Sequence, residues 1–288
     1  MKSQNNQYPL AVIFMILSGL AFALMALFVK GSNSLPLMER VFFRNLVVLI
    51  IPLASWISKP NYSLWGRKGN RGLLLLRSLF GFLGVLGYFY AISQMNLADS
   101  SVLNKLSPFF VTFFAGLFLK EKITKKEVVA LVLAFTGALF IIKPTWNYSM
   151  LPALSGFTSG LLAGVAYTII RGLHNRNERS TVILFYFSLV SLLLSGLMMI
   201  KGFRVPDSSE LISLLLIGVF AAGGQYFLTI SYKFAEASKV SIYSYSNIVF
   251  SALFGFILWQ EVPDTYSIIG GIIIVFAALW IFIVQKKK

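Results

Sequence analysis

The first long apolar stretch, residues 9–29, reads PLAVIFMILSGLAFALMALFV and contains no charged side chain. A helix needs about 20 apolar residues to cross the hydrocarbon core of a bilayer, so this run is long enough to span a membrane. Nine further apolar runs follow, separated by short polar loops. The ten runs are residues 9–29, 36–57, 72–93, 99–119, 127–143, 151–171, 181–200, 210–231, 237–259 and 265–284. The sequence predicts an all-α integral membrane protein with ten transmembrane helices.

The composition excludes several classes of function. Hydrophobic residues make up 57% of the 288 residues and charged residues only 12%, whereas soluble domains carry about 25% charged residues. The chain has no cysteine and a single histidine, His174, in a polar loop. It also lacks the G-x-x-x-x-G-K-[ST] phosphate loop of ATP-driven proteins. We therefore expect no metal, no cofactor and no enzymatic activity.

The distribution of basic residues predicts the topology. If the N-terminus is cytoplasmic, the cytoplasmic ends and loops hold 17 lysines and arginines and the opposite side holds four. Short cytoplasmic loops rich in lysine and arginine are typical of membrane proteins, so the net charge of +15 indicates orientation rather than nucleic-acid binding. We expect a multi-pass protein of the plasma membrane with both termini in the cytoplasm.

The two halves of the chain resemble each other. Residues 88–93 read YFYAIS and residues 226–231 read YFLTIS, and Glu121 and Glu261 each lie two residues past the end of a span. Each half contains an odd number of spans, so the second half lies inverted relative to the first. Inverted repeats are typical of secondary transporters, which bind substrate near the midplane between the repeats. We divide the chain into repeats at 1–145 and 146–288.

With these features the chain resembles the drug/metabolite transporter superfamily, of the EamA type. The residues that carry the resemblance are Arg44, Tyr90-Ala91, Ser107-Pro108-Phe109, Lys120-Glu121, Gly137 and Lys143-Pro144. The resemblance implies two EamA repeats and transport by alternating access. It also implies that the third, fourth, eighth and ninth spans line the central pathway. It does not imply a particular substrate.

Four cationic residues lie within the apolar runs: Arg40, Arg44, Arg77 and Lys105. Apart from Asp99 at a span edge, the only carboxylate in the same runs is Glu39. A charge at bilayer depth is costly unless a partner or polar cavity receives it. On the predicted topology Arg40, Arg44 and Lys105 lie in the outer half and Arg77 near the cytoplasmic mouth.

This excess of positive charge predicts an anionic or zwitterionic substrate, such as an amino acid or an organic anion. We expect Arg44 and Lys105 to bind it, with a structural pairing or a contact to helix-end carbonyls as the alternative for each. We expect Glu39, Arg40 and Arg77 to form a gate or ion pair. Alternatively, Arg40 with Glu39, and Arg77, lie at the membrane interfaces, where long side chains extend their charged ends into water. The other candidate substrate-binding residues are Tyr88, Tyr90, Asn104, Ser107, Tyr226, Tyr243, Ser244, Tyr245 and Asn247.

For any single one of these tyrosines, helix packing is an equally good explanation.

Pro108 cannot donate a backbone hydrogen bond, which predicts a bend in the fourth span beside Lys105. Gly156, Gly160 and Gly164 form a stripe of small residues that favours close helix packing, within one bundle or in a homodimer.

Three other functions remain as alternatives. A proton-coupled efflux pump for a broader range of drugs and metabolites would need a buried carboxylate, and Glu39 is the candidate. A channel would share the membrane spans but would not saturate. A membrane-embedded enzyme would need a clustered nucleophile, base or metal site, which this sequence does not supply.

Overall fold

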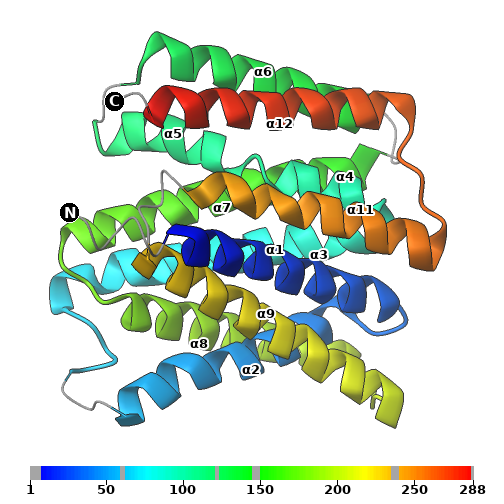
Figure 1. Ribbon diagram of the computed structural model, residues 1–288. Helices are drawn as coiled ribbons and strands as arrows, with labels where there is room; N and C mark the ends of the chain where they lie inside the picture. Colours follow the sequence, from blue (N-terminus) through cyan, green and yellow to red (C-terminus); the bar gives the residue numbers. More distant parts are fainter. Residues whose placement is uncertain (1–7, 59–61, 121–122, 145–149, 235–239, 287–288) are drawn as a thin grey trace.

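The computed structural model describes residues 8–58, 62–120, 123–144, 150–234 and 240–286, and within these it contains helices and no strand (Figure 1). The long helices are α1 (Tyr8–Gly31), α2 (Leu37–Ser58), α3 (Arg71–Gln94), α4 (Leu97–Asn104), α5 (Ser107–Phe118), α6 (Lys125–Ile142), α7 (Leu151–Asn175), α8 (Ser180–Met199), α9 (Ser208–Phe234), α11 (Ser246–Trp259) and α12 (Thr265–Lys286). Three short 3₁₀ helices join them: η1 (Lys68–Asn70), η3 (Ile200–Gly202) and η4 (Ser241–Tyr245).

Most of the predicted spans meet the requirements for crossing a bilayer. In the described part of the chain, nine helical stretches are long and apolar enough. The remaining predicted span, the fifth (residues 127–143), corresponds to α6, whose 18 residues begin with Lys125, Lys126 and Glu127. It lies alongside α12 at one edge of the bundle (Figure 1). The helices run roughly parallel, and α1 begins on the side where α12 ends, as expected when both termini share one side of the membrane.

Helices of the N-terminal half pack against helices of the C-terminal half in reciprocal pairs. The first helix of the N-terminal half, α1, packs along α9, the third helix of the C-terminal half. Reciprocally, α3 packs along α7, while α2 pairs with α8 and α6 with α12. This reciprocity is the arrangement that an inverted repeat produces.

The fourth and ninth spans are both interrupted. In the fourth, α4 ends at Asn104 and α5 begins at Ser107, with Lys105 capping the end of α4. Pro108 stands in the first turn of α5, where its missing N–H is tolerated, and the bend predicted beside Lys105 is confirmed. In the ninth, the 3₁₀ helix η4 precedes α11.

Local chemistry fixes the ends of helices near these breaks. Thr124 and Glu127 form a reciprocal capping box at the start of α6. Gln260 ends α11 in the left-handed conformation, with φ 56°. Its counterpart after α5, Lys120, has φ 57°, so the two halves close their fourth helices in the same way. Glu121 lies outside the described residues.

The glycine stripe of α7 is covered by the same chain. A Cβ at Gly160 would lie 2.6 Å from the carbonyl oxygen of Leu103, and one at Gly164 would lie 2.3 Å from Cβ of Phe110. Gly156 likewise faces Leu103. The stripe therefore brings α7 against α4 and α5, and packing within the bundle accounts for it. The homodimer surface suggested by these glycines is not available, because α4 and α5 occupy it.

Candidate functional site

The breaks in the fourth and ninth spans meet at Lys105. The hydroxyl of Tyr245, at the end of η4, donates a hydrogen bond to the backbone oxygen of Lys105 over 3.2 Å. Lys105 is partly buried, and within the described residues its ammonium group has neither a hydrogen-bond nor an ion-pair partner. Asn104 beside it donates to Ser159 of α7. A cation without a counter-ion thus lies where two interrupted helices converge.

A chain of buried hydroxyl groups lies on the same helices. The hydroxyls of Tyr88 on α3 and Ser101 on α4 are 3.2 Å apart, and Ser101 donates to Ser251 of α11 over 2.9 Å. The Ser101 and Ser251 side chains are fully buried. Tyr88 is therefore held in a polar connection between the third, fourth and ninth spans, three of the four that the family resemblance places at the pathway.

The remaining candidate binding residues lie in different surroundings. Asn247 is buried and donates to the backbone oxygen of Gly19 on α1, and the hydroxyl of Tyr243 lies 3.5 Å from that of Tyr8. Ser107 is buried at the start of α5, and Ser244 is partly buried in η4. Tyr90 and Tyr226 are 37% and 55% exposed at the surface of the bundle. The structure thus gathers only some of the predicted residues around the two helix breaks.

Arg40 and Glu39 are buried and bonded within the protein. The Nη1 atom of Arg40 donates to the backbone oxygen of Val29 and to Oγ of Ser93. Glu39 is fully buried, and one of its carboxylate oxygens accepts from the backbone N–H of Arg204 over 2.6 Å. Neither charged group extends into solvent, so the structure does not support the expectation that these side chains reach into water. They connect α2 to α1, to α3 and to the segment before α9.

Arg44 and Arg77 converge on one aromatic ring. Arg44 is 5% exposed and Arg77 8% exposed, and their guanidinium carbons lie 5.4 Å and 4.0 Å from the ring centroid of Phe187 on α8. The sequence placed Arg44 in the outer half and Arg77 near the cytoplasmic mouth. Both guanidinium groups nevertheless reach the same ring, so the two residues are closer than their places along the spans suggest. Arg77 is buried against Phe187 rather than extended into solvent.

An ion pair joins separate helices at the end of the bundle that the predicted topology places outside. The ammonium group of Lys30, at the end of α1, forms a salt bridge with Glu261 and also donates to the backbone oxygen of Met95. The second carboxylate oxygen of Glu261 accepts from the N–H of Leu97, the first residue of α4. We call Lys30, Glu261, Met95 and Leu97 the outer latch. It joins α1, the turn between α3 and α4, and the end of α11.

A second ion pair on the same side lies at the edge of the bundle. Lys143, after α6, pairs with Asp264, before α12. The hydrogen bond from Lys143, with a further one from the N–H of Ser267, holds the pKa of the Asp264 carboxyl below its usual range. Both partners are well exposed, so this pair contributes little to stability.

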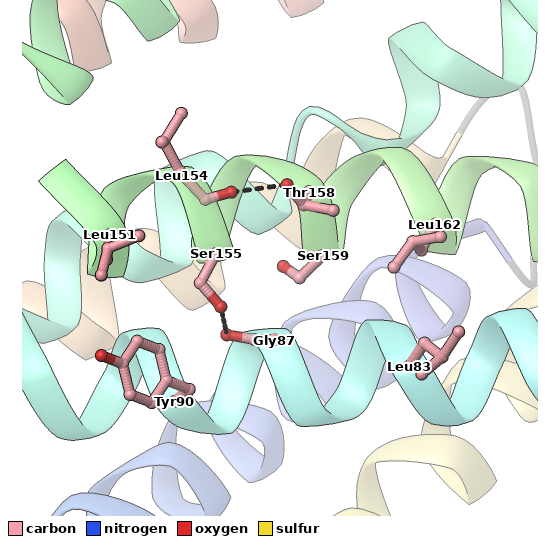
Figure 2. A pocket seen from close by; sticks show the side chains of 9 residues that line it. All are labelled: Leu83, Gly87, Tyr90, Leu151, Leu154, Ser155, Thr158, Ser159 and Leu162. Carbon is pink, nitrogen blue, oxygen red and sulfur yellow. Dashed lines mark hydrogen bonds between the residues drawn. The ribbon is translucent and has the colours of Figure 1, made fainter. Parts of the chain in front are cut away.

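A shallow groove of about 430 Å³ lies between α3 and α7 (Figure 2). Tyr90 and Leu83 line one side, and Leu151 and Leu154 line the other. The helices touch where Ser155 donates to the backbone oxygen of Gly87 over 2.9 Å. Because Tyr90, Leu83 and Leu151 are well exposed, the groove lies on the outer surface of the bundle and does not contain Lys105 or Arg44.

Three features of the site were not predicted from the sequence. Phe187 carries no signal of its own among the 27 phenylalanines. Asp99 is buried and accepts from the hydroxyl of Ser267 on α12, although it lies at the edge of its span. For the outer latch, the sequence did single out Glu261, because it occupies the same position in the second half as Glu121 in the first. Nothing in the sequence indicated that Glu261 pairs with Lys30.

Comparison with known proteins agrees with this architecture. The model of the EamA-like transporter family matches the chain twice, at residues 9–143 and 150–283. The chain belongs to the EamA-like transporter family. It is a multi-pass membrane protein and a transporter of small metabolites rather than an enzyme.

Several named proteins are similar to this chain over most of their length. The pseudopaline exporter CntI of Pseudomonas aeruginosa is 38% identical, covering 93% of this chain and 94% of its own. Human solute carrier family 35 member G1 is 26% identical over 92% of this chain and 77% of its own, and a riboflavin transporter of Rhizobium johnstonii is 28% identical over 74% and 71%. A crystal structure with 16% identity covers 96% of this chain with a TM-score of 0.68, which shows the fold.

Proposed function

We propose that this EamA-family transporter exports a small anionic or zwitterionic metabolite, such as an amino acid or an organic anion, by alternating access. The observation that carries the proposal is that three cations inside the bundle lack a counter-ion among the described residues. Arg44, Arg77 and Lys105 have no carboxylate within ion-pair distance in the described part of the chain. The similarity to a protein named as an exporter supports the direction.

The energetics favour a negatively charged substrate. Removing an ion from water costs several kcal/mol unless a partner offsets the loss, and charges at bilayer depth are typical of substrate and ion pathways. A bound carboxylate would offset this cost, since the attraction between charges is stronger in a low-dielectric interior than in water. Substrate binding would then offset part of the desolvation free energy of the buried cations.

The position of Lys105 supports a binding role. It caps the end of α4 where the fourth span is interrupted, and Tyr245 connects it to the interrupted ninth span. In secondary transporters, interrupted helices near the midplane form the substrate site. We place the anionic group of the substrate against Lys105, with Asn104, Tyr88 and Tyr245 contributing polar contacts.

A binding screen on purified protein tests the proposal. Glutamate and succinate should raise the melting temperature, whereas succinamide and choline should not, because a ligand that binds only the folded state stabilises it. Lys105→Gln should weaken the carboxylate response about tenfold or more, while Lys126→Gln, at the exposed start of α6, should not. Stabilisation by cationic or neutral compounds alone would overturn the proposal.

A proton-coupled efflux pump is the second candidate, and one observation favours it. Oε2 of Glu39 is buried and has no hydrogen-bond partner among the described residues. A buried carboxyl group with a free oxygen is suited to bind and release a proton. This candidate predicts that transport depends on the ionisation of Glu39.

A further inference from the structure

The convergence of Arg44 and Arg77 on Phe187 has the geometry of a binding site. Since both guanidinium carbons lie within 5.4 Å of one ring centroid, they are at most 9.4 Å apart. Arg44 comes from α2, Arg77 from α3 and Phe187 from α8. Two like charges from separate helices are thus held together deep in the protein, an arrangement that their mutual repulsion opposes.

The donors of these two arginines are largely unused. Nε and Nη1 of Arg77, and Nε of Arg44, are buried without a hydrogen-bond partner in the part of the chain that the structure describes. The Nη1 atom of Arg44 donates to Oδ1 of the neighbouring Asn45 over 2.8 Å. Buried polar groups in proteins are almost always satisfied, so three free donors at one place indicate a missing acceptor.

The surrounding helices make room for this arrangement. Gly81 lies one turn after Arg77 on α3, and a Cβ there would come within 2.9 Å of the Phe187 ring and 3.2 Å of Nη1 of Arg77. Ser191, one turn after Phe187 on the same face of α8, has a buried hydroxyl without a partner. Four residues on two helices therefore combine close packing with unsatisfied polar atoms.

Arg40 shows what a structural arginine looks like in the same helix. It lies one turn before Arg44 on α2 and is equally buried. Its Nε atom also lacks a hydrogen-bond partner among the described residues, but its Nη1 atom has two acceptors, the backbone oxygen of Val29 and the hydroxyl of Ser93. The protein thus supplies acceptors to a buried arginine that connects helices, and it does not supply them to Arg77.

We propose that Arg44 and Arg77 together bind a carboxylate group of the transported metabolite, at a station separate from Lys105. This inference rests on the proposed function and extends it. Guanidinium groups present paired N–H donors that match the two oxygens of a carboxylate. Within the described residues, no hydrogen bond and no shared aromatic partner links Lys105 with Arg44 or Arg77. The substrate therefore meets two cationic stations in turn, or spans both when it carries two acidic groups.

Thermal stability of purified, detergent-solubilised protein tests this assignment. Glutamate, succinate, succinamide and inorganic phosphate serve as probes for the wild type and for Arg44→Gln, Arg77→Met, Arg77→Lys and Lys105→Gln. Arg71→Gln is the control, since Arg71 lies at the exposed start of α3. The carboxylate response should weaken about 10- to 100-fold in Arg44→Gln and Arg77→Met, as expected when a charged hydrogen bond is lost. Arg71→Gln should match the wild type.

A second readout separates binding from structure. Without ligand, Arg77→Met should melt no lower than the wild type, because the substitution removes a buried charge whose donors have no partner. Arg77→Lys keeps the charge but not the paired donors, so it should fold normally and respond weakly to carboxylates. An Arg77→Met variant that fails to fold, together with an Arg77→Lys variant of unchanged carboxylate response, would assign Arg77 a structural role and overturn the inference.

The remaining outcomes distinguish the inference from the proposed function. A carboxylate response that is lost in Lys105→Gln but kept in Arg44→Gln and Arg77→Met would refute the paired-arginine station and leave the proposed function standing. If only phosphate stabilised the wild type, the carboxylate assignment would be wrong. If no anion stabilised it, both proposals would fall.

Discussion

Replacing Glu261 by glutamine should open the outer latch. The carboxylate of Glu261 pairs with Lys30 and accepts from the N–H of Leu97. Glutamine has nearly the same shape and keeps an oxygen that can accept from Leu97, so the start of α4 stays capped. It loses the charge, and Lys30 is left with the backbone oxygen of Met95 and the Trp259 ring, whose centroid lies 5.7 Å from the ammonium group.

The size of the effect follows from the burial of the pair. The side chains of Lys30 and Glu261 are only 13% and 12% exposed. Exposed ion pairs contribute about 0–1 kcal/mol, whereas breaking a fully buried pair costs about 3–5 kcal/mol. An intermediate value of about 2 kcal/mol corresponds to a roughly 30-fold larger population of the state that is open on this side. The proposed alternating access requires such a state, and we expect the latch to restrict it.

Thiol labelling measures that population, because the chain has no cysteine of its own. Ser101→Cys places a thiol at a fully buried position between α3, α4 and α11. When opening is fast relative to labelling, the rate with an impermeant maleimide on intact cells follows the open population. Glu261→Gln should raise this rate about 30-fold.

The neighbouring ion pair provides a matched control. Asp264→Asn breaks the exposed pair between Lys143 and Asp264 on the same side, away from the latch. It should leave labelling of Ser101→Cys unchanged. A labelling rate that rises less than about threefold in Glu261→Gln, in protein that melts like the parent, would refute the latch. An equal rise in Asp264→Asn would show that the effect is not specific to it.

Three further predictions concern topology, coupling and packing. A cysteine at Lys125 should resist an impermeant thiol reagent applied to intact cells, since the positive-inside rule places this loop in the cytoplasm; labelling from outside would invert the topology. Glu39→Gln should retain transport and its pH dependence if the carboxyl group is structural, and complete loss of transport at normal protein levels would favour proton coupling. Gly160→Ala should lower the free energy of unfolding by about 1–3 kcal/mol in thermal or denaturant melts, because its Cβ would lie 2.6 Å from a backbone oxygen. Gly72→Ala is the control: a Cβ at Gly72 meets nothing within 4 Å, so this change should be neutral or stabilising.

The fold could be predicted from the sequence because the bilayer constrains it strongly. Each span must be a long apolar helix that satisfies its own backbone hydrogen bonds, so hydropathy alone locates nearly all of them. The break beside Pro108 was also predictable, since proline removes a backbone donor. The pairing of α1 with α9 was not, because every long helix is apolar on most faces and the sequence does not say which faces meet.

The site was less predictable, because the position of a long side chain along its helix does not fix where its charged end lies. Counting residues along each helix separates Arg44 from Arg77, yet both guanidinium groups reach Phe187. The same count places Arg40 one turn from Arg44 on the same face and suggests a shared role. Their partners differ completely, since Arg40 bonds to Val29 and Ser93. Those acceptors come from other helices, and no local pattern in the sequence identifies them.

Pairing, rather than depth, therefore separates the structural cations of this protein from its candidate binding cations. Lys30 has the Glu261 carboxylate and a backbone oxygen, and Arg40 has two oxygen acceptors. Arg77 and Lys105 have neither for their charged groups in the described part of the chain. Since the protein supplies acceptors to the cations that connect its helices, it could have supplied them to the other cations as well. That it leaves Arg77 and Lys105 without acceptors is consistent with a ligand supplying the negative charge.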